Sequence, residues 1–239
     1  MTSNNLASCC YQGVKHDGDA RGRYETIADF EAYIVEPEKP NNYGILSQCC
    51  SHSSFGYTVI VPDLFFRDPV PLNADMATFS FPDWMGGKFG AKGIAHVPET
   101  VDPVVAASLK AVRGKYGVKR VAGVGYCFGA KYALRALGSG DVDATYLASP
   151  AIVTPEELSA VKGPLAIATA KTDDIFPTPL RHNTKPLLLK LDIPYQINLY
   201  SGVTHGFAIR CDLSVKSQKL AKESAFLFAV QWFDQYLAE

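Results

Sequence analysis

Apolar positions in the second half of the chain change repeatedly between the period of a strand and that of a helix. Short apolar runs predict strands over residues 119–124, 144–148, 164–170 and 195–200. Apolar positions at helical spacing predict helices over residues 128–137, 155–161, 177–191 and 213–237. Because strands and helices that alternate in this way build parallel sheets, we expect an α/β fold, with a mostly parallel sheet and helices on both faces.

The first half of the chain has a less regular pattern. Residues 1–22 are polar and contain glycine, which predicts an irregular N-terminal arm. Roughly alternating apolar residues over 24–35 predict one strand, and the β-branched run at residues 57–61 is typical of a buried parallel strand. Residues 66–97 carry several prolines and glycines and predict mostly loop with short helices. Helical spacing returns over residues 98–116.

The composition narrows the class of protein. With 239 residues, 47% of them hydrophobic, and a formal net charge of −1, the chain can bury a large core and is not intrinsically disordered. The near balance of 23 basic and 24 acidic residues argues against a nucleic-acid-binding surface. No apolar run approaches the roughly 20 residues that span a bilayer, so we expect no membrane partner. No linker or change in composition divides the chain, which predicts a single domain over residues 1–239.

The first residues lack the basic and apolar regions of a secretory signal, which predicts a cytoplasmic protein. Six cysteines are too few for a disulfide scaffold, and in a reducing compartment they are free, bound to metal, or catalytic. Two cysteine-rich groups offer metal ligands, namely Cys9, Cys10 and His16, and Cys49, Cys50 and His52. Because adjacent cysteine side chains diverge and make poor chelators, we expect no metal and no cofactor.

One cysteine lies where catalytic chemistry is expected. The segment Gly125-Tyr126-Cys127-Phe128-Gly129 follows a predicted strand and opens a predicted helix, which is the pattern of a nucleophile elbow with cysteine as the nucleophile. Such a turn lifts the thiol above the carboxyl edge of the sheet and places it at a helix N-terminus, which favours the thiolate. The backbone N–H of Phe128 then points to where an oxyanion would form. The other interpretation is a tight turn with a buried thiol.

A cysteine nucleophile needs a base that takes its proton, and the base needs an acidic side chain that orients it. His205 follows the predicted strand 195–200 in the loop where such a histidine lies, whereas His182 falls within a predicted helix and reads as a surface residue. Asp173 and Asp174 follow the predicted strand 164–170. Adjacent side chains point to different sides, so one of the two serves as the acid, with Asp173 preferred.

These motifs together resemble the dienelactone hydrolase family of the α/β-hydrolase fold, in its fungal-type branch. The motif GVGYCFG carries the nucleophile, TDDIFP the acid and GVTHGFAIR the histidine. The arm SCCYQGVKHDGDARG and the strand end VIVPDLF are also similar to that branch. The similarity extends from about residue 8 to the end of the chain.

The resemblance implies hydrolysis of a small ester or lactone by a Cys-His-Asp triad through a thioester acyl-enzyme. Carried over, Cys127 attacks the carbonyl, His205 is the base, and Asp173 is its partner because the family's acid stands four residues before a proline, here Pro177. Arg210 is the nearest match to the family's substrate-binding arginine, one residue further along than in the best-known bacterial form. We expect a small-molecule ester or lactone as the partner, and a monomer or weak homo-oligomer.

The chain departs from the family after residues 44–46. Family members carry there a loop with an acidic residue, which supplies the second oxyanion N–H, and then a helix. Here nine residues, 47–55, none of them acidic, lead to Gly56-Tyr57, so roughly a dozen residues are missing. Three accounts stay open: a variant with a remodelled oxyanion hole, a catalytically weakened relative, or an aberrant gene product. The alternative function is a non-catalytic member that binds a small carboxylic acid or a partner.

Overall fold

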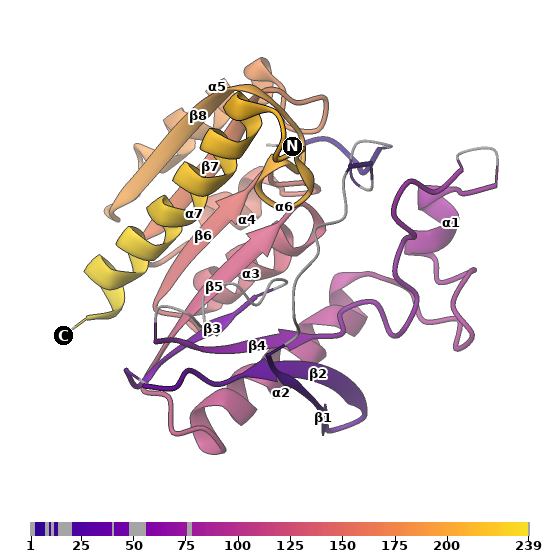
Figure 1. Cartoon of the computed structure of the whole chain (residues 1–239), viewed down its shortest axis with the longest axis vertical. Helices are drawn as coiled ribbons and strands as arrows, with labels where there is room; N and C mark the ends of the chain where they lie inside the picture. Colours follow the sequence, from indigo (N-terminus) through magenta and orange to yellow (C-terminus); the bar gives the residue numbers. More distant parts are fainter. Residues whose placement is uncertain are drawn as a thin grey trace. The chain divides into compact units, whose positions relative to one another are not determined.

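The structure, a computed structural model, describes residues 3–7, 10, 12–13, 21–39, 41–47, 56–75 and 78–238 (Figure 1). Contacts divide these residues into two units. One unit comes from Met1–His16 and Ala122–Glu239, and the other comes from Asp17–Val121. The single domain expected over residues 1–239 stays a prediction.

The unit from Asp17–Val121 contains a small mixed sheet in the order β1-β2-β4-β3. Its strands are β1 (Arg23–Ile27), β2 (Phe30–Val35), β3 (Tyr43–Leu46) and β4 (Thr58–Pro62). Helix α2 (Pro98–Gly114) packs against β1, β3 and β4, because its apolar positions Val101, Val105 and Leu109 recur at helical spacing and are buried. The one helix described within residues 66–97 is α1 (Phe81–Met85), so the prediction of mostly loop there is confirmed.

The single strand predicted over residues 24–35 is wrong. Strands β1 and β2 form an antiparallel hairpin in which Ile27 is the partner of Phe30. The turn lies at Ala28, whose φ of +54° is in the left-handed region. Asparagine and glycine usually occupy such a turn, so Ala28 does not indicate it, and the neighbouring Asp29 is a weak turn signal within a run that otherwise resembles a strand.

The other unit contains a parallel sheet with the order β5-β6-β7-β8. Its strands are β5 (Arg120–Tyr126), which begins two residues before the unit does, β6 (Ala144–Ala148), β7 (Leu165–Thr172) and β8 (Tyr195–Thr204). All four strands were predicted, although β8 extends four residues beyond the predicted end at residue 200. Of the six strand pairings described in the two units, four are parallel, as expected for a mostly parallel sheet.

Helices cover both faces of this parallel sheet (Figure 1). Helices α3 (Phe128–Ser139), α4 (Pro155–Ser159) and α5 (Thr178–Leu188) follow one another on one face, and α7 (Lys216–Leu237) crosses β6, β7 and β8 on the other. The strands between them are apolar on both sides: every residue of β6 is buried. Within the described residues, no helix is both long and apolar enough to cross a membrane.

Candidate active site

The predicted elbow is present between β5 and α3. Cys127 connects the strand to the helix with φ +49° and ψ −111°, a strained conformation that residues other than glycine rarely adopt. Its N–H donates to the carbonyl of Ala148 at 3.1 Å, and its carbonyl accepts from the N–H groups of Ala130 and Ala151 at 3.1 Å each. The surrounding hydrogen bonds therefore hold Cys127 in this conformation. Its side chain is nearly buried, with 8% exposed.

Gly125 allows the tight turn. A Cβ atom at this position would lie 2.5 Å from the Cα of Ala130 and 2.6 Å from the carbonyl oxygen of Gly129, both of which are backbone atoms. Because the backbone of α3 has no room to move away from the strand, only glycine fits here. The glycine in this motif is thus explained by the close approach of strand and helix.

Asp173 and His205 lie side by side at the carboxyl ends of β7 and β8. The Nδ1 of His205 is 2.9 Å from Oδ1 and 3.0 Å from Oδ2 of Asp173, and both residues are buried. The same Oδ1 accepts the backbone N–H groups of Ile175 and Phe176 at 2.9 Å each. These bonds fix the carboxylate, which in turn orients the ring of His205. Asp174, the other candidate acid, is exposed.

The ionisation of His205 is strongly perturbed. Burial would lower the pKa of this imidazole, but the hydrogen bonds to Asp173 and then to Cys10 outweigh burial and raise the pKa from 6.5 to about 9. The ring is therefore a cation near neutral pH.

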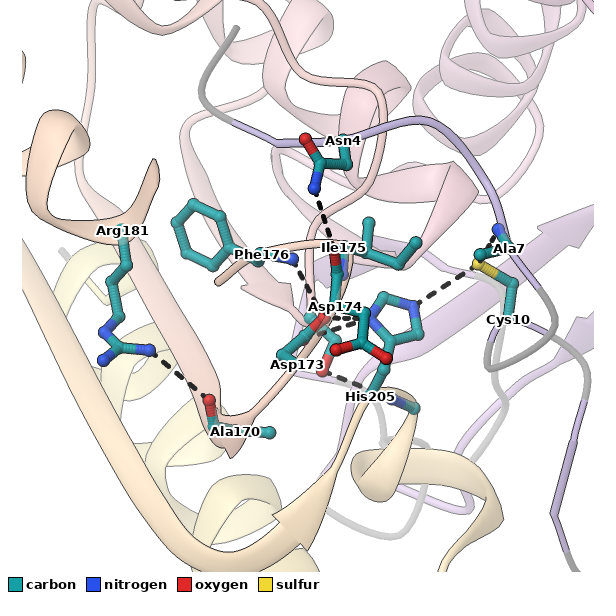
Figure 2. A network of polar contacts seen from close by, with 12 residues as sticks. Asn4, Ala7, Cys10, Ala170, Asp173, Asp174, Ile175, Phe176, Arg181 and His205 are labelled. Atoms are coloured by element: carbon teal, nitrogen blue, oxygen red, sulfur yellow. Dashed lines mark hydrogen bonds and ion pairs between the residues drawn. The ribbon is translucent and has the colours of Figure 1, made fainter. Parts of the chain in front are cut away.

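A second thiol, from the N-terminal arm, meets the same histidine. The Sγ of Cys10 is 3.7 Å from Nε2 of His205, and Figure 2 shows the ring between this sulfur and the carboxylate of Asp173. The ligand atoms of Cys10, Cys127 and His205 all lie within 4.8 Å of one another. Two thiols and one base thus share a single small volume.

Hydrogen bonds attach Ser3 and Asn4 of the arm to backbone groups of the loops that follow β6 and β7. The N–H of Asn4 donates to the carbonyl of Ile175 at 2.6 Å, and its side-chain amide donates to the carbonyl of Asp174 at 2.8 Å (Figure 2). The N–H of Val153 donates to the hydroxyl of Ser3 at 2.8 Å. Side chains of the arm also pack against Cys127 and Ile175 in one apolar cluster. The described part of the arm therefore covers the elbow.

Arg210 lies at the end of the short helix α6 (Phe207–Arg210), close to His205 in sequence and in space. Its Nε donates to the carbonyl of Gln12 at 3.2 Å. Arg210 and His205 both line a cavity of about 220 Å³. Arg210 and the base thus line the same cavity.

Several sequence predictions fall partly or wholly outside the described residues. Of the two cysteine-rich groups, only Cys10 is described, so neither group is tested; the described residues with metal-ligating atoms near Cys10 are Cys127 and His205. Residues 48–55, which hold most of the segment expected to have lost an oxyanion loop, are not described. The loss of the loop that supplies the second oxyanion donor therefore stays a prediction. His182, predicted to be a surface residue, is exposed in α5.

The sequence pattern did not predict Cys10 as a residue of the active site. It grouped Cys10 with Cys9 and His16 as a weak metal-ligand set in an irregular arm. The signal that could have found it is the arm motif itself, because a cysteine pair in a chain with only six cysteines is an unusual feature for an unstructured end. The packing of the arm over the elbow, which gives Cys10 its position, is a tertiary feature without a local pattern.

Sequence comparison with known proteins identifies one family. The profile described as "Dienelactone hydrolase family" matches residues 30–237. "Hydrolase tropI" of Talaromyces stipitatus is 42% identical over 254 aligned residues, with 100% of both chains covered. Because this alignment is longer than the 239 residues of the chain, that relative has residues without a counterpart here. "Dienlactone hydrolase 2" of Gibberella moniliformis is 26% identical, covering 96% of this chain and 94% of that protein.

Solved structures give the same fold. The dienelactone hydrolase of Anabaena variabilis superimposes with a TM-score of 0.60 at 12% identity, covering 90% of this chain and 99% of that one. At this identity the likeness concerns the fold alone, and it agrees with the mostly parallel sheet. The chain belongs to the dienelactone hydrolase family of hydrolases, and it has the α/β-hydrolase fold predicted from its sequence.

Proposed function

We propose that this protein hydrolyses a small carboxylic ester or lactone, with Cys127 as nucleophile, His205 as base and Asp173 as the acid that orients the base. The observation that carries the proposal is the buried Asp173–His205 pair, whose remaining ring nitrogen faces the thiol region at the strained elbow. The names of several relatives, dienelactone hydrolase and carboxymethylenebutenolidase homologue, support a lactone or ester as the substrate class.

The proposed reaction is an acyl transfer in two halves. The sulfur of Cys127 attacks the carbonyl carbon, its proton resides on Nε2 of His205, and the carbonyl oxygen becomes an oxyanion next to the N–H of Phe128. The tetrahedral species collapses to a thioester, and His205 gives the proton to the departing alkoxide. In a lactone this oxygen stays in the same molecule, because the ring opens.

The second half releases the acid. His205 takes a proton from water, the resulting hydroxide attacks the thioester carbonyl, and collapse expels the thiolate of Cys127, which recovers the proton. Asp173 holds Nδ1–H throughout, so that the lone pair of Nε2 faces the reaction. Arg210 binds a carboxylate elsewhere on the substrate. Neither a metal nor a cofactor takes part in this sequence.

Cys10 offers a second candidate for the nucleophile, because its sulfur lies 3.7 Å from Nε2. The elbow favours Cys127: it lies at the N-terminus of the 12-residue helix α3 and in a strained conformation, whereas Cys10 lies in an irregular arm. The two thiols give a matched pair of variants. We expect Cys127→Ala to abolish hydrolysis of p-nitrophenyl acetate and of a dienelactone, whereas Cys10→Ala should retain turnover.

The competing function is a non-catalytic member that binds a small acid or a partner. Alkylation separates the two, because a catalytic thiol reacts with iodoacetamide well below pH 8 and an inert thiol does not. Burial raises the pKa of the Cys211 thiol, so this residue is an internal reference for slow alkylation. We expect Cys127 to react faster than Cys211 and to lose this advantage in His205→Ala. Equal hydrolysis by wild type and Cys127→Ala would exclude the triad.

We further propose that the protein acts in the reducing cytoplasm as a monomer or weak homo-oligomer.

A further inference from the structure

We propose that Cys10, Cys127 and His205 form a binding site for a soft divalent metal ion, Zn²⁺ in particular, and that the bound ion reversibly blocks hydrolysis. The block rests on the proposed function, whereas the binding of the ion stands on the three side chains alone. The proposed cation is thus an inhibitor of the site and has no part in the reaction.

The three ligand atoms have the spacing that a tetrahedral ion requires. With Zn–S of about 2.3 Å and Zn–N of about 2.0–2.1 Å, sulfur and nitrogen ligands lie about 3.6 Å apart, and two sulfurs about 3.8 Å apart. The Cys10 Sγ to His205 Nε2 distance is 3.7 Å, and no pair among the three ligand atoms is further apart than 4.8 Å. Side-chain adjustments of about 1 Å would therefore complete the coordination.

The histidine is already prepared for a metal. In protein zinc sites a ligating histidine commonly donates its other N–H to a carboxylate, which fixes the tautomer and aims the lone pair. Asp173 holds Nδ1 of His205 at 2.9 Å, and its own oxygen is fixed by two backbone N–H groups. The Nε2 of His205 therefore faces the two sulfurs, and loss of its proton leaves the lone pair aimed at a bound ion.

The ligands come from three separate segments of the chain. The divergence of side chains that makes adjacent cysteines poor chelators therefore does not apply to them. Cys10 comes from the arm, Cys127 from the elbow and His205 from the loop after β8. A backbone N–H, that of Ala7, lies 3.4 Å from the sulfur of Cys10 and donates to it. Two thiolates and one imidazole are the soft donor set that selects Zn²⁺ over Mg²⁺ or Ca²⁺, and three protein ligands leave a fourth position for water.

Binding and catalysis compete for the same electron pairs. On binding, the sulfurs of Cys10 and Cys127 and the Nε2 of His205 release the protons that they carry to solvent, and each of the three atoms donates an electron pair to the ion. Cys127 then has no pair for the carbonyl, and His205 cannot accept a proton. Removal of the ion by a chelator restores both groups without any change in the covalent structure.

Cobalt provides the test of binding, because tetrahedral Co²⁺ with thiolate ligands shows intense visible and near-ultraviolet bands. Reduced wild type in a phosphine reductant is titrated with Co²⁺ and then with Zn²⁺. We expect one Co²⁺ with thiolate bands, displaced by Zn²⁺. Cys10→Ser should weaken binding by about tenfold or more and lower the charge-transfer intensity. Cys211→Ser should bind like wild type, because Cys211 lines the cavity of His205 but is not among the three clustered ligand residues.

Two results would overturn the metal site. One is a Cys10→Ser protein that binds Co²⁺ as tightly as wild type and with the same spectrum. The other is loss of the bands in a Cys49→Ser/Cys50→Ser variant but not in Cys10→Ser, since the ion would then bind to that pair.

Activity tests the second half of the proposal. Zn²⁺ should inhibit ester hydrolysis by the wild type, and EDTA should restore it. For Cys10→Ser, half-inhibition relative to its own zinc-free rate should need about tenfold more Zn²⁺ or more. Equal sensitivity of the two proteins would contradict the block. A chain that binds Co²⁺ through Cys10 but hydrolyses nothing would refute the proposed function and leave the metal site standing.

Discussion

Replacing Asp173 by asparagine changes the proposed triad without removing volume. The Oδ1 of asparagine can still accept the N–H groups of Ile175 and Phe176, which lie 2.9 Å from Oδ1 of Asp173. Its amide nitrogen would, however, face Nδ1 of His205 and donate to it. The proton of the ring would then move to Nε2, the nitrogen that has to accept the proton of Cys127.

The size of the effect follows from the pKa of His205. A pKa of about 9, against an ordinary 6.5, corresponds to about 3 kcal/mol of preference for the imidazolium, at 1.36 kcal/mol for each tenfold change. Loss of the carboxylate removes most of this preference, which is worth about 100-fold in rate because the proposed reaction passes through the imidazolium. The wrong tautomer adds to the loss, so we expect kcat to fall between about 10²-fold and 10⁴-fold.

The neighbouring acid provides the control. Asp174 is exposed, and the contact described for it is through its backbone carbonyl to Asn4, so Asp174→Asn should retain kcat. Both variants are assayed with p-nitrophenyl acetate in the presence of EDTA, with thermal unfolding measured alongside to show that each is folded. A folded Asp173→Asn protein within about tenfold of wild-type kcat would refute the assignment of the acid, and a larger loss in Asp174→Asn would reverse it.

Three further predictions concern the turn, the ion pair and the substrate. Gly125→Ala places a Cβ 2.5 Å from the backbone of α3 and should lower the free energy of unfolding by about 1–3 kcal/mol or more. At Gly114 a Cβ would meet nothing within 4 Å, so Gly114→Ala should raise the free energy of unfolding by about 0.4–1 kcal/mol. Urea unfolding measures both changes. Because the folded pKa of His205 is raised to about 9, its pairing with Asp173 stabilises the fold fully below pH 6.5 and loses this effect as the pH rises through 9. The difference in unfolding free energy between wild type and His205→Gln in EDTA should therefore shrink from pH 6 to pH 10, and a constant difference would speak against the ion pair. Arg210→Ala should raise KM about 10–100-fold for a lactone that bears a carboxylate and leave KM for neutral p-nitrophenyl acetate unchanged; equal effects on both would argue against a carboxylate contact.

The second half of the chain was predictable because its local patterns agree with its tertiary structure. Each strand from β5 to β8 is a short apolar run. Cys127 follows β5 directly, Asp173 follows β7 and His205 follows β8. Parallel strands bring their carboxyl ends to the same edge, so Cys127, Asp173 and His205 could be expected near one another from the order of elements alone. The hydrogen bond between Asp173 and His205 fits this expectation.

The arm and the first hairpin could not be predicted in the same way. Cys10 reaches His205 because the arm is bonded through the N–H and side-chain amide of Asn4 and the hydroxyl of Ser3. Small polar residues of this kind occur in any irregular segment, so the sequence does not indicate where they bind. The hairpin turn at Ala28 places an ordinary residue in the left-handed region, against its own preference. In both places the tertiary structure overrides what the local sequence indicates.

The central claim is that Cys127 forms the acyl-enzyme, and direct trapping of that intermediate tests it. The zinc-free protein is mixed with p-nitrophenyl acetate, quenched in acid within the first turnover, digested and analysed by mass spectrometry. The account predicts an acetyl thioester on the peptide that contains Cys127, and its loss in His205→Ala. An acetyl group on the peptide that contains Cys10, with Cys127 unmodified, would contradict the account.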